Sequence, residues 1–365
     1  MSVKVLVISK YTDYHSTRPE ASIFHGLAKC GFKIFIMTRR DSKHAEEFEK
    51  SGITVIDYQP AKKFDRKESQ YIRKFIIEND IDIVHLFNGK AIINGIRAAR
   101  GLKVKVVLYR GYAGNINWWD PTAYLKFLHP RVDAIFCNSK GVEDYLRSKL
   151  ICGKHKAVTI NKGHDLHWYD NNPPTNLHKE FGIPEDAFVL INIANNRRMK
   201  GIPYLLEALN SLPEEANIHL LLVGRDMDTP ENLAILKKGT KEERVHFTGF
   251  RNDVLNIVAA SDVFVLPSIK GESITKSVIE SMSLGTPAII SDIPGNVELV
   301  EDGKSGLVFP SKNSNALSVA ILKLYNDREL CNRLGNNARK HIAENLSNIQ
   351  TIEKTAQLYQ QLLSI

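Results

Sequence analysis

Three cations fall within four residues just before a predicted helix. The segment 195–201 reads NNRRMKG and follows a short apolar run that predicts a strand. Its charges come from Arg197, Arg198 and Lys200. Fixed cations beside a helix N-terminus suit a phosphate or diphosphate. A solvated turn explains such a loop about equally well when the loop is taken alone. The loop therefore indicates anion binding only together with a second feature.

Two glutamates eight residues apart supply that feature. Glu272 and Glu280 lie in ESITKSVIE, before and along another predicted helix. At ~1.5 Å of rise per residue, they would lie about 12 Å apart along the helix direction, close to the span from a sugar through a diphosphate to a ribose. Ser273 or Thr275 can cap this helix and leave free N–H groups near the ligand. One carboxylate could then hold hydroxyls at each end of such a ligand, whereas a solvated helix face is the alternative explanation for two glutamates taken alone.

The usual fingerprints of cofactor enzymes are missing. No G-x-G-x-x-G follows a predicted strand, and no Walker G-x-x-x-x-G-K-[ST] loop occurs. This disfavours a nicotinamide or flavin dehydrogenase and a P-loop protein. The four cysteines are scattered without a C-x-x-C pair, which argues against a zinc ribbon and a disulfide framework. We therefore expect no cofactor and no zinc ribbon.

Elements that could position these residues follow from the hydrophobic pattern. Short β-branched runs alternate with segments of helical period, which is typical of parallel sheets wrapped by helices. A chain of 365 residues, 43% hydrophobic and 25% charged, fits two domains of ordinary size. We predict an α/β protein with two doubly wound, Rossmann-like domains facing a cleft. One predicted helix, residues 19–30, has Pro19 in its first turn and Gly31 just beyond its end. The predicted strands are residues 3–9, 32–38, 54–58, 82–86, 104–109, 134–138, 157–160, 189–193, 219–223, 245–247, 263–266, 288–291 and 306–309.

The predicted domain boundary lies at residue 165. Residues 1–165 form the first domain and residues 166–346 the second. The segment 170–175 (DNNPPT) is the expected linker, because its two prolines and paired asparagines disfavour both helix and strand. Residues 347–365 carry apolar side chains at three- and four-residue steps. We expect this last helix to cross back onto the first domain.

Basic residues concentrate in the first half of the chain. Residues 1–180 hold 30 Lys and Arg against 19 Asp and Glu, whereas residues 181–365 hold 19 against 22. A solvated surface and attraction to anionic lipid are both consistent with this asymmetry. Nucleic acid is disfavoured, because the cations do not cluster with aromatic residues. Since there is no apolar run of about eighteen residues and no signal-peptide cleavage site, we expect a cytoplasmic protein, peripheral on the inner face of the cell membrane if its acceptor is lipid-linked.

Several segments between residues 190 and 310 occur in the order and spacing of one enzyme family. They are ANNRRMKGIPYLLEAL, VHFTGF, ASDVFVLPS, the pair Glu272 and Glu280, LGTPAIISDIPGNVELV and EDGKSGLVFP. Through them the chain resembles the family-4 glycosyltransferases, which are retaining enzymes of the two-Rossmann GT-B architecture.

The resemblance implies roles for the donor-site residues. Glu272 would contact the donor sugar and Glu280 the ribose hydroxyls. Lys200 and either Arg197 or Arg198 would contact the diphosphate. We assign Glu272, Lys200 and Arg197 to catalysis. The remaining expected donor contacts are Arg198, Ser273, Ile274, Thr275, Lys276, Glu280, Gly249 and Phe250.

The first half matches the family more loosely. Where many members carry a Gly-Gly loop after the first strand, this chain has a longer polar segment that ends at Glu20. Where many carry a histidine after a middle strand, it has Arg110 and Tyr112 nearby. These three residues are the weaker candidates for the acceptor side, and Arg110 fits a buried salt bridge equally well. Trp118 and Trp119 suit stacking on a sugar or packing in the core.

The resemblance therefore implies a retaining glycosyltransferase that needs no metal. It would move a sugar from a nucleotide diphosphate sugar to a glycan or lipid-linked acceptor, in cell-surface polysaccharide or glycolipid synthesis. One alternative is a nucleotide-sugar epimerase of the same architecture, which would turn over without an acceptor. The other is a non-catalytic subunit that binds a sugar nucleotide, which the altered first-domain loops favour.

Overall fold

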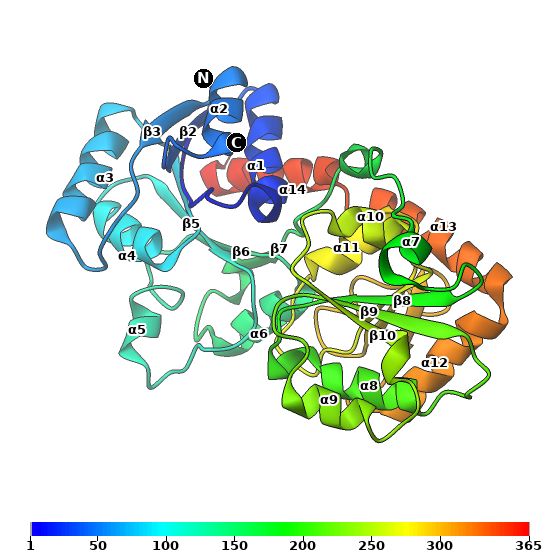
Figure 1. Cartoon of the computed structure of the whole chain (residues 1–365). Helices are drawn as coiled ribbons and strands as arrows, with labels where there is room; N and C mark the ends of the chain where they lie inside the picture. Colours follow the sequence, from blue (N-terminus) through cyan, green and yellow to red (C-terminus); the bar gives the residue numbers. More distant parts are fainter. Residues whose placement is uncertain (1, 365) are drawn as a thin grey trace. The chain divides into compact units, whose positions relative to one another are not determined.

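Every predicted strand forms in the computed structural model, which describes residues 2–364, and the strands assemble into two separate parallel sheets (Figure 1). The predicted α/β class with two doubly wound sheets is confirmed. The chain divides into a first unit, up to Gly163 and again from Leu346, and a second unit, His164–Asn345. Residues 1 and 365, at the ends of the predicted domains, lie outside the described residues.

The sheet of the first unit has the strand order β3-β2-β1-β4-β5-β6-β7, and all its pairs are parallel. Its strands are β1 (Lys4–Ile8), β2 (Lys33–Thr38), β3 (Thr54–Asp57), β4 (Ile83–Leu86), β5 (Lys105–Arg110), β6 (Ala134–Cys137) and β7 (Ala157–Thr159). Its helices are α1 (Tyr14–Lys29), α2 (Lys43–Lys50), α3 (Arg66–Glu78), α4 (Gly89–Ala98), α5 (Pro121–Tyr124), α6 (Lys140–Lys149) and α14 (Asn348–Leu363).

Both faces of this sheet are buried. Leu6 and Ile8 of β1 belong to the core under α3, α4 and α6, whereas Val5 and Val7 belong to the core under α1, α2 and α14. A strand that is covered on both faces needs apolar residues at every position. This explains why the strands are readable in the sequence as continuous apolar runs.

The last helix, α14, packs on the first unit beside α1. A Cβ atom on Gly26 of α1 would overlap the side chain of Ile352, so the glycine permits the close approach of the two helices. Tyr359 is fully buried, and its hydroxyl lies 2.7 Å from Nδ1 of His85 in β4. Ile349, one of the apolar residues of the segment 347–365, is exposed.

The second unit has the strand order β10-β9-β8-β11-β12-β13, again with parallel pairs. Its strands are β8 (Phe188–Ile193), β9 (Ile218–Val223), β10 (Val245–Gly249), β11 (Val263–Leu266), β12 (Ala288–Ser291) and β13 (Gly306–Phe309). Its helices are α7 (Leu177–Phe181), α8 (Ile202–Asn210), α9 (Pro230–Leu236), α10 (Val254–Ala259), α11 (Lys276–Ser283), α12 (Ser314–Asn326) and α13 (Arg328–Asn345).

Two local predictions were wrong. The helix expected from residue 19 begins at Tyr14, because the carboxylate of Asp13 accepts the N–H of Ser16 and caps it, and Pro19 therefore lies inside the helix. The expected linker 170–175 belongs to the second unit. There Asp170 pairs with Arg339 at 3.1 Å, which anchors the segment.

Each sheet has one place where the strand order reverses. In the first unit it lies between β1 and β4, and in the second between β8 and β11. Successive connections leave such a point in opposite directions, so a crevice opens beyond the carboxyl ends of the two strands. The predicted donor residues lie on the loops that follow β8 and β11.

Candidate active site

The loops after β8 and β11 are held together through their backbones. The N–H of Ile269 donates to the carbonyl of Met199 at 2.8 Å. Gly201 has a φ of 69°, in the left-handed region, and a Cβ atom there would overlap the carbonyl oxygen of Pro267. Only glycine satisfies both conditions at low cost. The cationic loop is thus fixed against the segment that carries Glu272.

This contact brings Lys200 and Glu272 together, although they are 72 residues apart. Nζ of Lys200 lies 2.5 Å from Oε1 of Glu272, and their side chains are only 17% and 11% exposed. The same oxygen accepts a hydrogen bond from Ser268 at 2.9 Å, and Thr275 donates to Oε2 at 3.3 Å. The carboxylate therefore has a fixed position, and the lysine beside it supplies a positive charge.

Thr275 precedes α11 as its N-cap residue but does not cap it. Its hydroxyl lies within hydrogen-bond distance of two acceptors, Oε2 of Glu272 and, at 3.1 Å, Oδ1 of Asn296, which share its single proton, and it makes no side-chain bond to a helix N–H. The expected side-chain cap is therefore absent from Thr275. The first N–H groups of a helix have no intrahelical acceptor, so those of Lys276 and Ser277 remain available to an anion.

Neighbouring backbone also approaches Ser273. A Cβ atom on Gly295, whose φ is 91°, would lie 2.7 Å from the Cα atom of Ser273. The loop after β12 therefore supports the segment that precedes α11. Ile274 is half-buried in the same segment.

Glu280 lies one turn into α11, where it forms an ion pair with Lys276. Its side chain is mostly buried. The helix begins at Lys276, so only half of the eight-residue interval from Glu272 is helical. The 12 Å estimate, which assumed helical rise throughout, does not describe this geometry.

Arg197 and Arg198 are both exposed. Arg198 belongs to the short 3-10 turn Arg198–Lys200, and Arg197 precedes it. Lys200 is held in this turn by its own N–H, which donates to the carbonyl of Arg197 at 2.8 Å. Both arginines are therefore exposed beside Lys200.

A cavity of about 280 Å³ lies next to Lys200. Phe250, 62% exposed, lines it, and the guanidinium of Arg225 lies 5.0 Å from the centre of the Phe250 ring. Gly249 ends β10, and its carbonyl accepts the N–H of Gly224 at 2.9 Å. The full lining is Ile193, Ala194, Asn195, Lys200, Val223, Gly224, Phe250, Arg251 and Val254. Asn195 and Arg251, which line this cavity, and Ser268, which binds Glu272, were not among the predicted site residues. The one sequence feature that could have indicated them is their position shortly after a predicted strand.

The weaker candidates in the first unit have internal partners. Arg110 is 5% exposed, and its Nε donates to the carbonyl of Tyr112 at 2.8 Å while its guanidinium stacks on the Tyr112 ring. Burial lowers the pKa of Arg110. Glu20 is also buried and pairs with Lys162 at 2.9 Å. Arg110 forms no salt bridge among the described residues, and it orders a loop through carbonyl groups instead.

The side chains that usually bind metal ions are not clustered in the part of the chain that the structure describes. Among residues 2–364, no three His, Cys, Asp or Glu side chains are grouped so that they could hold a metal ion. The positive charges near Glu272 come from side chains and from the start of α11.

Two family descriptions match the chain. "Glycosyltransferase Family 4" matches residues 21–168, and "Glycosyl transferases group 1" matches residues 174–341. The chain belongs to the family-4 glycosyltransferases. It is a glycosyltransferase enzyme, and the epimerase and non-catalytic alternatives have less support than this activity.

Named relatives agree with this family. The N-acetyl-alpha-D-glucosaminyl L-malate synthase of Bacillus anthracis is 29% identical over 59% of this chain and 58% of that protein. A Campylobacter jejuni enzyme, N,N'-diacetylbacillosaminyl-diphospho-undecaprenol alpha-1,3-N-acetylgalactosaminyltransferase, is 27% identical over 92% of each chain. The crystal structure of HepE from Anabaena in complex with UDP superposes with a TM-score of 0.79, at 18% identity, over 99% of this chain and 100% of that one. The last similarity bears on the fold, which is GT-B.

Proposed function

We propose that this glycosyltransferase transfers a sugar, with retention of configuration and without a metal, from a UDP-sugar to a lipid-linked glycan acceptor in cell-surface polysaccharide or glycolipid synthesis. The observation that carries the proposal is the fixed Lys200–Glu272 pair beside the open start of α11, at the point where the strand order reverses. A buried carboxylate with an adjacent cation suits a sugar hydroxyl next to a diphosphate.

Leaving-group stabilisation is the main chemical task of this site. Negative charge builds on the diphosphate as the glycosidic bond breaks, so contacts to its oxygens strengthen in the transition state. Lys200, one of Arg197 and Arg198, and the first N–H groups of α11 supply these contacts in the proposal. Together they replace the charge that a metal ion provides in other enzymes.

The cavity beside Lys200 is proposed to take the nucleoside. Phe250 offers a ring on which a base can stack, and Glu280 would accept hydrogen bonds from the ribose hydroxyls. HepE, which shares the fold, has been solved with UDP. This supports uridine as the proposed base.

A lipid-linked acceptor is proposed from the relatives. The Campylobacter jejuni enzyme is named for a diphospho-undecaprenol substrate, whereas the Bacillus anthracis enzyme is named for malate. No helix within residues 2–364 is both long enough and apolar enough to cross a bilayer. Access to a lipid substrate would then require contact with the membrane surface.

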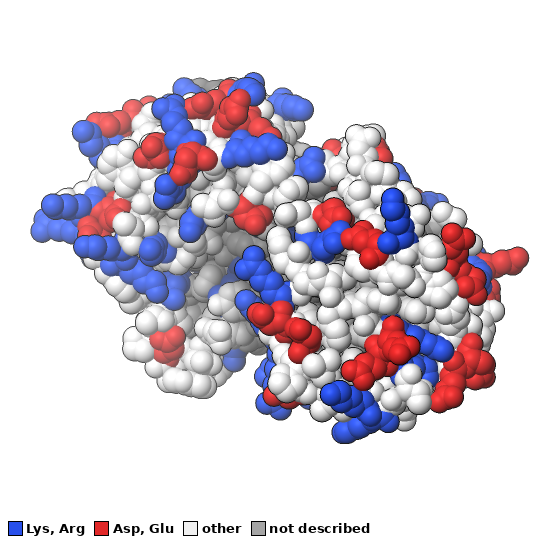
Figure 2. Space-filling model, in the orientation of Figure 1, with Lys and Arg blue, Asp and Glu red and all other residues white. Residues whose placement is uncertain are grey.

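An exposed aromatic surface in the first unit is suited to that contact. Trp119 is 80% exposed and Trp118 53% exposed, so their packing in the core is excluded. The indole N–H of Trp118 donates to the carbonyl of Lys149 at 2.8 Å, and Nζ of Lys149 lies 5.5 Å from the centre of the Trp118 ring. Figure 2 shows Lys and Arg side chains gathered over α3 and α4, which share a core with residues 116–127. Tryptophan and cations together favour an anionic bilayer interface.

A thermal-shift series tests the donor assignment. UDP and UDP-sugars should raise the melting temperature in the presence of EDTA, because a ligand that binds the folded state stabilises it. GDP and ADP should do so less. Radiolabelled UDP-sugars with an extracted membrane-lipid fraction should then give a labelled lipid product, also with EDTA present. Loss of transfer in EDTA that Mg²⁺ or Mn²⁺ restores would contradict the metal-independent mechanism.

A further inference from the structure

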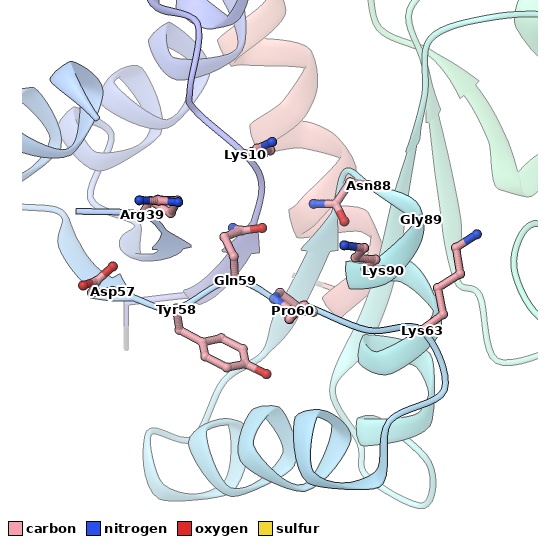
Figure 3. Close-up of a pocket in the computed structure, with 11 residues that line it drawn as sticks. Lys10, Arg39, Asp57, Tyr58, Gln59, Pro60, Lys63, Asn88, Gly89 and Lys90 are labelled. Atoms are coloured by element: carbon pink, nitrogen blue, oxygen red, sulfur yellow. The ribbon is translucent and has the colours of Figure 1, made fainter. Parts of the chain in front are cut away.

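A large cavity in the first unit remains without a role. It has a volume of about 860 Å³ and lies beyond the carboxyl ends of β1 to β4 (Figure 3). We call it the basic cavity. Its lining residues are Lys10, Arg39, Asp57, Tyr58, Gln59, Pro60, Ala61, Lys63, Asn88, Gly89 and Lys90. The volume suits a ligand of nucleotide or sugar-phosphate size.

The basic cavity occupies the place in the first sheet that the donor site occupies in the second. Lys10 follows β1, and Asn88 to Lys90 follow β4, which are the two strands on either side of the reversal in strand order. In the second unit, Lys200 and Glu272 follow β8 and β11 in the same way. Ligands of open α/β sheets bind at such points. The topology therefore marks the basic cavity as a second ligand site.

The charges of the side chains that line the basic cavity indicate the kind of ligand that it would bind. The cavity is lined by four cationic side chains, those of Lys10, Arg39, Lys63 and Lys90. Asp57 is the one carboxylate among the lining residues. Arg39 pairs with Asp41 at 2.6 Å, outside the lining. Among the described residues, the ammonium groups of the three lysines have no carboxylate within ion-pair distance. Unpaired cations in one concave site favour an anion with several charges.

The backbone around the cavity is fixed, and it offers donors. The side-chain N–H₂ group of Gln59, just after β3, donates to the carbonyls of Ser9, just after β1, and of Met37, in β2, both at 2.6 Å, and so fixes the segment after β3 against these two strands. Oδ1 of Asn88 accepts the N–H of Ala91 at 3.0 Å and caps α4. The N–H groups of Gly89 and Lys90 then begin the helix without intrahelical acceptors. Figure 3 shows Lys10, Gln59, Asn88 and Lys90 around the same space.

We propose that the basic cavity binds the phosphate or diphosphate group of the acceptor substrate, with Lys10 and Lys90 as its main ligands. The proposal rests on the proposed function, because the donor diphosphate is there assigned to Lys200 and α11 in the other unit. A second site for a polyvalent anion is then needed only by the other substrate. A glycan carried on a diphosphate lipid has this chemistry.

Calorimetric titration with inorganic pyrophosphate and with geranyl diphosphate tests the proposal. UDP is present at saturating concentration, so that the donor site is filled. The Lys10→Ala/Lys90→Ala variant should bind both probes at least tenfold more weakly than the wild type. The control Lys29→Ala/Lys103→Ala removes the same charge from exposed positions of the same unit. It should bind within twofold of the wild type.

The possible results separate the sources of the anion. Tighter binding of geranyl diphosphate than of pyrophosphate, with both lost in the Lys10/Lys90 variant, supports a lipid-linked acceptor. Equal binding of the two probes, lost in the same variant, supports a phosphate site for a water-soluble acceptor. Equal weakening in both double variants, or no pyrophosphate binding while UDP binds normally, overturns the proposal. A wild type that binds no UDP would instead contradict the proposed function, so the two failures are distinguishable.

Discussion

At the residue scale, the proposed donor site contains two kinds of group: those whose assigned ligand atoms change charge during the reaction and those whose assigned ligand atoms do not. Lys200 is assigned to the diphosphate, where charge builds up, and Glu280 to the ribose, which stays neutral. Glu272 lies between these cases, because it is assigned to the reacting sugar. Kinetic constants of single variants can distinguish these assignments.

Lys200→Ala should lower kcat by roughly a hundred- to a thousand-fold. Loss of one donor aimed at developing charge costs about 3 to 4 kcal/mol of transition-state stabilisation. Steady-state kinetics with circular dichroism as a folding check measure this, and Lys237→Ala, an exposed lysine of the same unit, is the control. Glu272→Ala should impair both kcat and KM. If the Lys200→Ala and Glu272→Ala proteins fold and keep a kcat/KM near that of the wild type, the donor does not bind at these residues.

Glu280→Ala should raise the donor KM more than it lowers kcat. The ribose carries no new charge in the transition state, so this contact contributes to ground-state and transition-state binding alike. Glu243→Ala, at an exposed position of the same unit, is the matched control. A fall in kcat at unchanged KM would instead assign Glu280 to the reacting end of the donor.

At the element scale, the site depends on how two loops meet at the ends of β8 and β11. Gly201→Ala should push the loop at Lys200 away from Pro267 and reduce kcat/KM by at least tenfold. The cause is steric, because the new methyl group would overlap a carbonyl oxygen. Gly182→Ala has a similar φ of 67° with nothing within 4 Å, so it isolates the cost of the backbone conformation. Equal activity losses in the two variants would contradict the steric explanation.

The burial of His85, which lies in β4 and contacts Tyr359 of α14, should make the free energy of unfolding depend on pH. Burial lowers the pKa of His85 to about 3, whereas an unfolded histidine titrates near 6.5. The unfolded chain therefore binds the extra proton first, and stability falls as pH drops from about 6.5 towards 3. Between pH 7.5 and 5.5, the wild type should lose about 1.4 kcal/mol more than His85→Gln. Urea unfolding at both pH values measures this, with the exposed His155→Gln as control. Parallel losses in wild type and His85→Gln would refute the assignment.

At the scale of the whole molecule, the first unit should bring the enzyme to anionic membranes. Wild-type protein should co-sediment with vesicles that contain phosphatidylglycerol and much less with phosphatidylcholine alone, since each Lys or Arg near the surface adds on the order of 1 kcal/mol. Trp118→Ala/Trp119→Ala should reduce this binding several-fold, whereas Ile349→Ala, at an exposed apolar position on α14, should not. Equal binding to both vesicle types would contradict this prediction, and the basic residues of the first half would then serve only to keep the protein in solution.

Most of the fold was predictable because its signals are local. A strand covered on both faces must be apolar along its length, as Val5 to Ile8 are, and such runs are visible without any knowledge of their neighbours. The start of α1 was not predicted, because a short side-chain contact from Asp13 outweighed the preference of Pro19 for a first turn. Helix ends are decided by individual hydrogen bonds, which a hydrophobic pattern does not record.

The sequence by itself determined the fold class, the family resemblance and the residue types of the proposed donor site. Only the tertiary structure decided which of these residues touch. Lys200 and Glu272 meet because β8 and β11 are neighbours in the sheet, and Lys10 and Lys90 line one cavity because β1 and β4 are neighbours. Strand order depends on how whole elements pack, so no local pattern encodes it. The burial of Glu20 and Arg110 and the exposure of Trp118 and Trp119 were likewise decided by the surrounding elements.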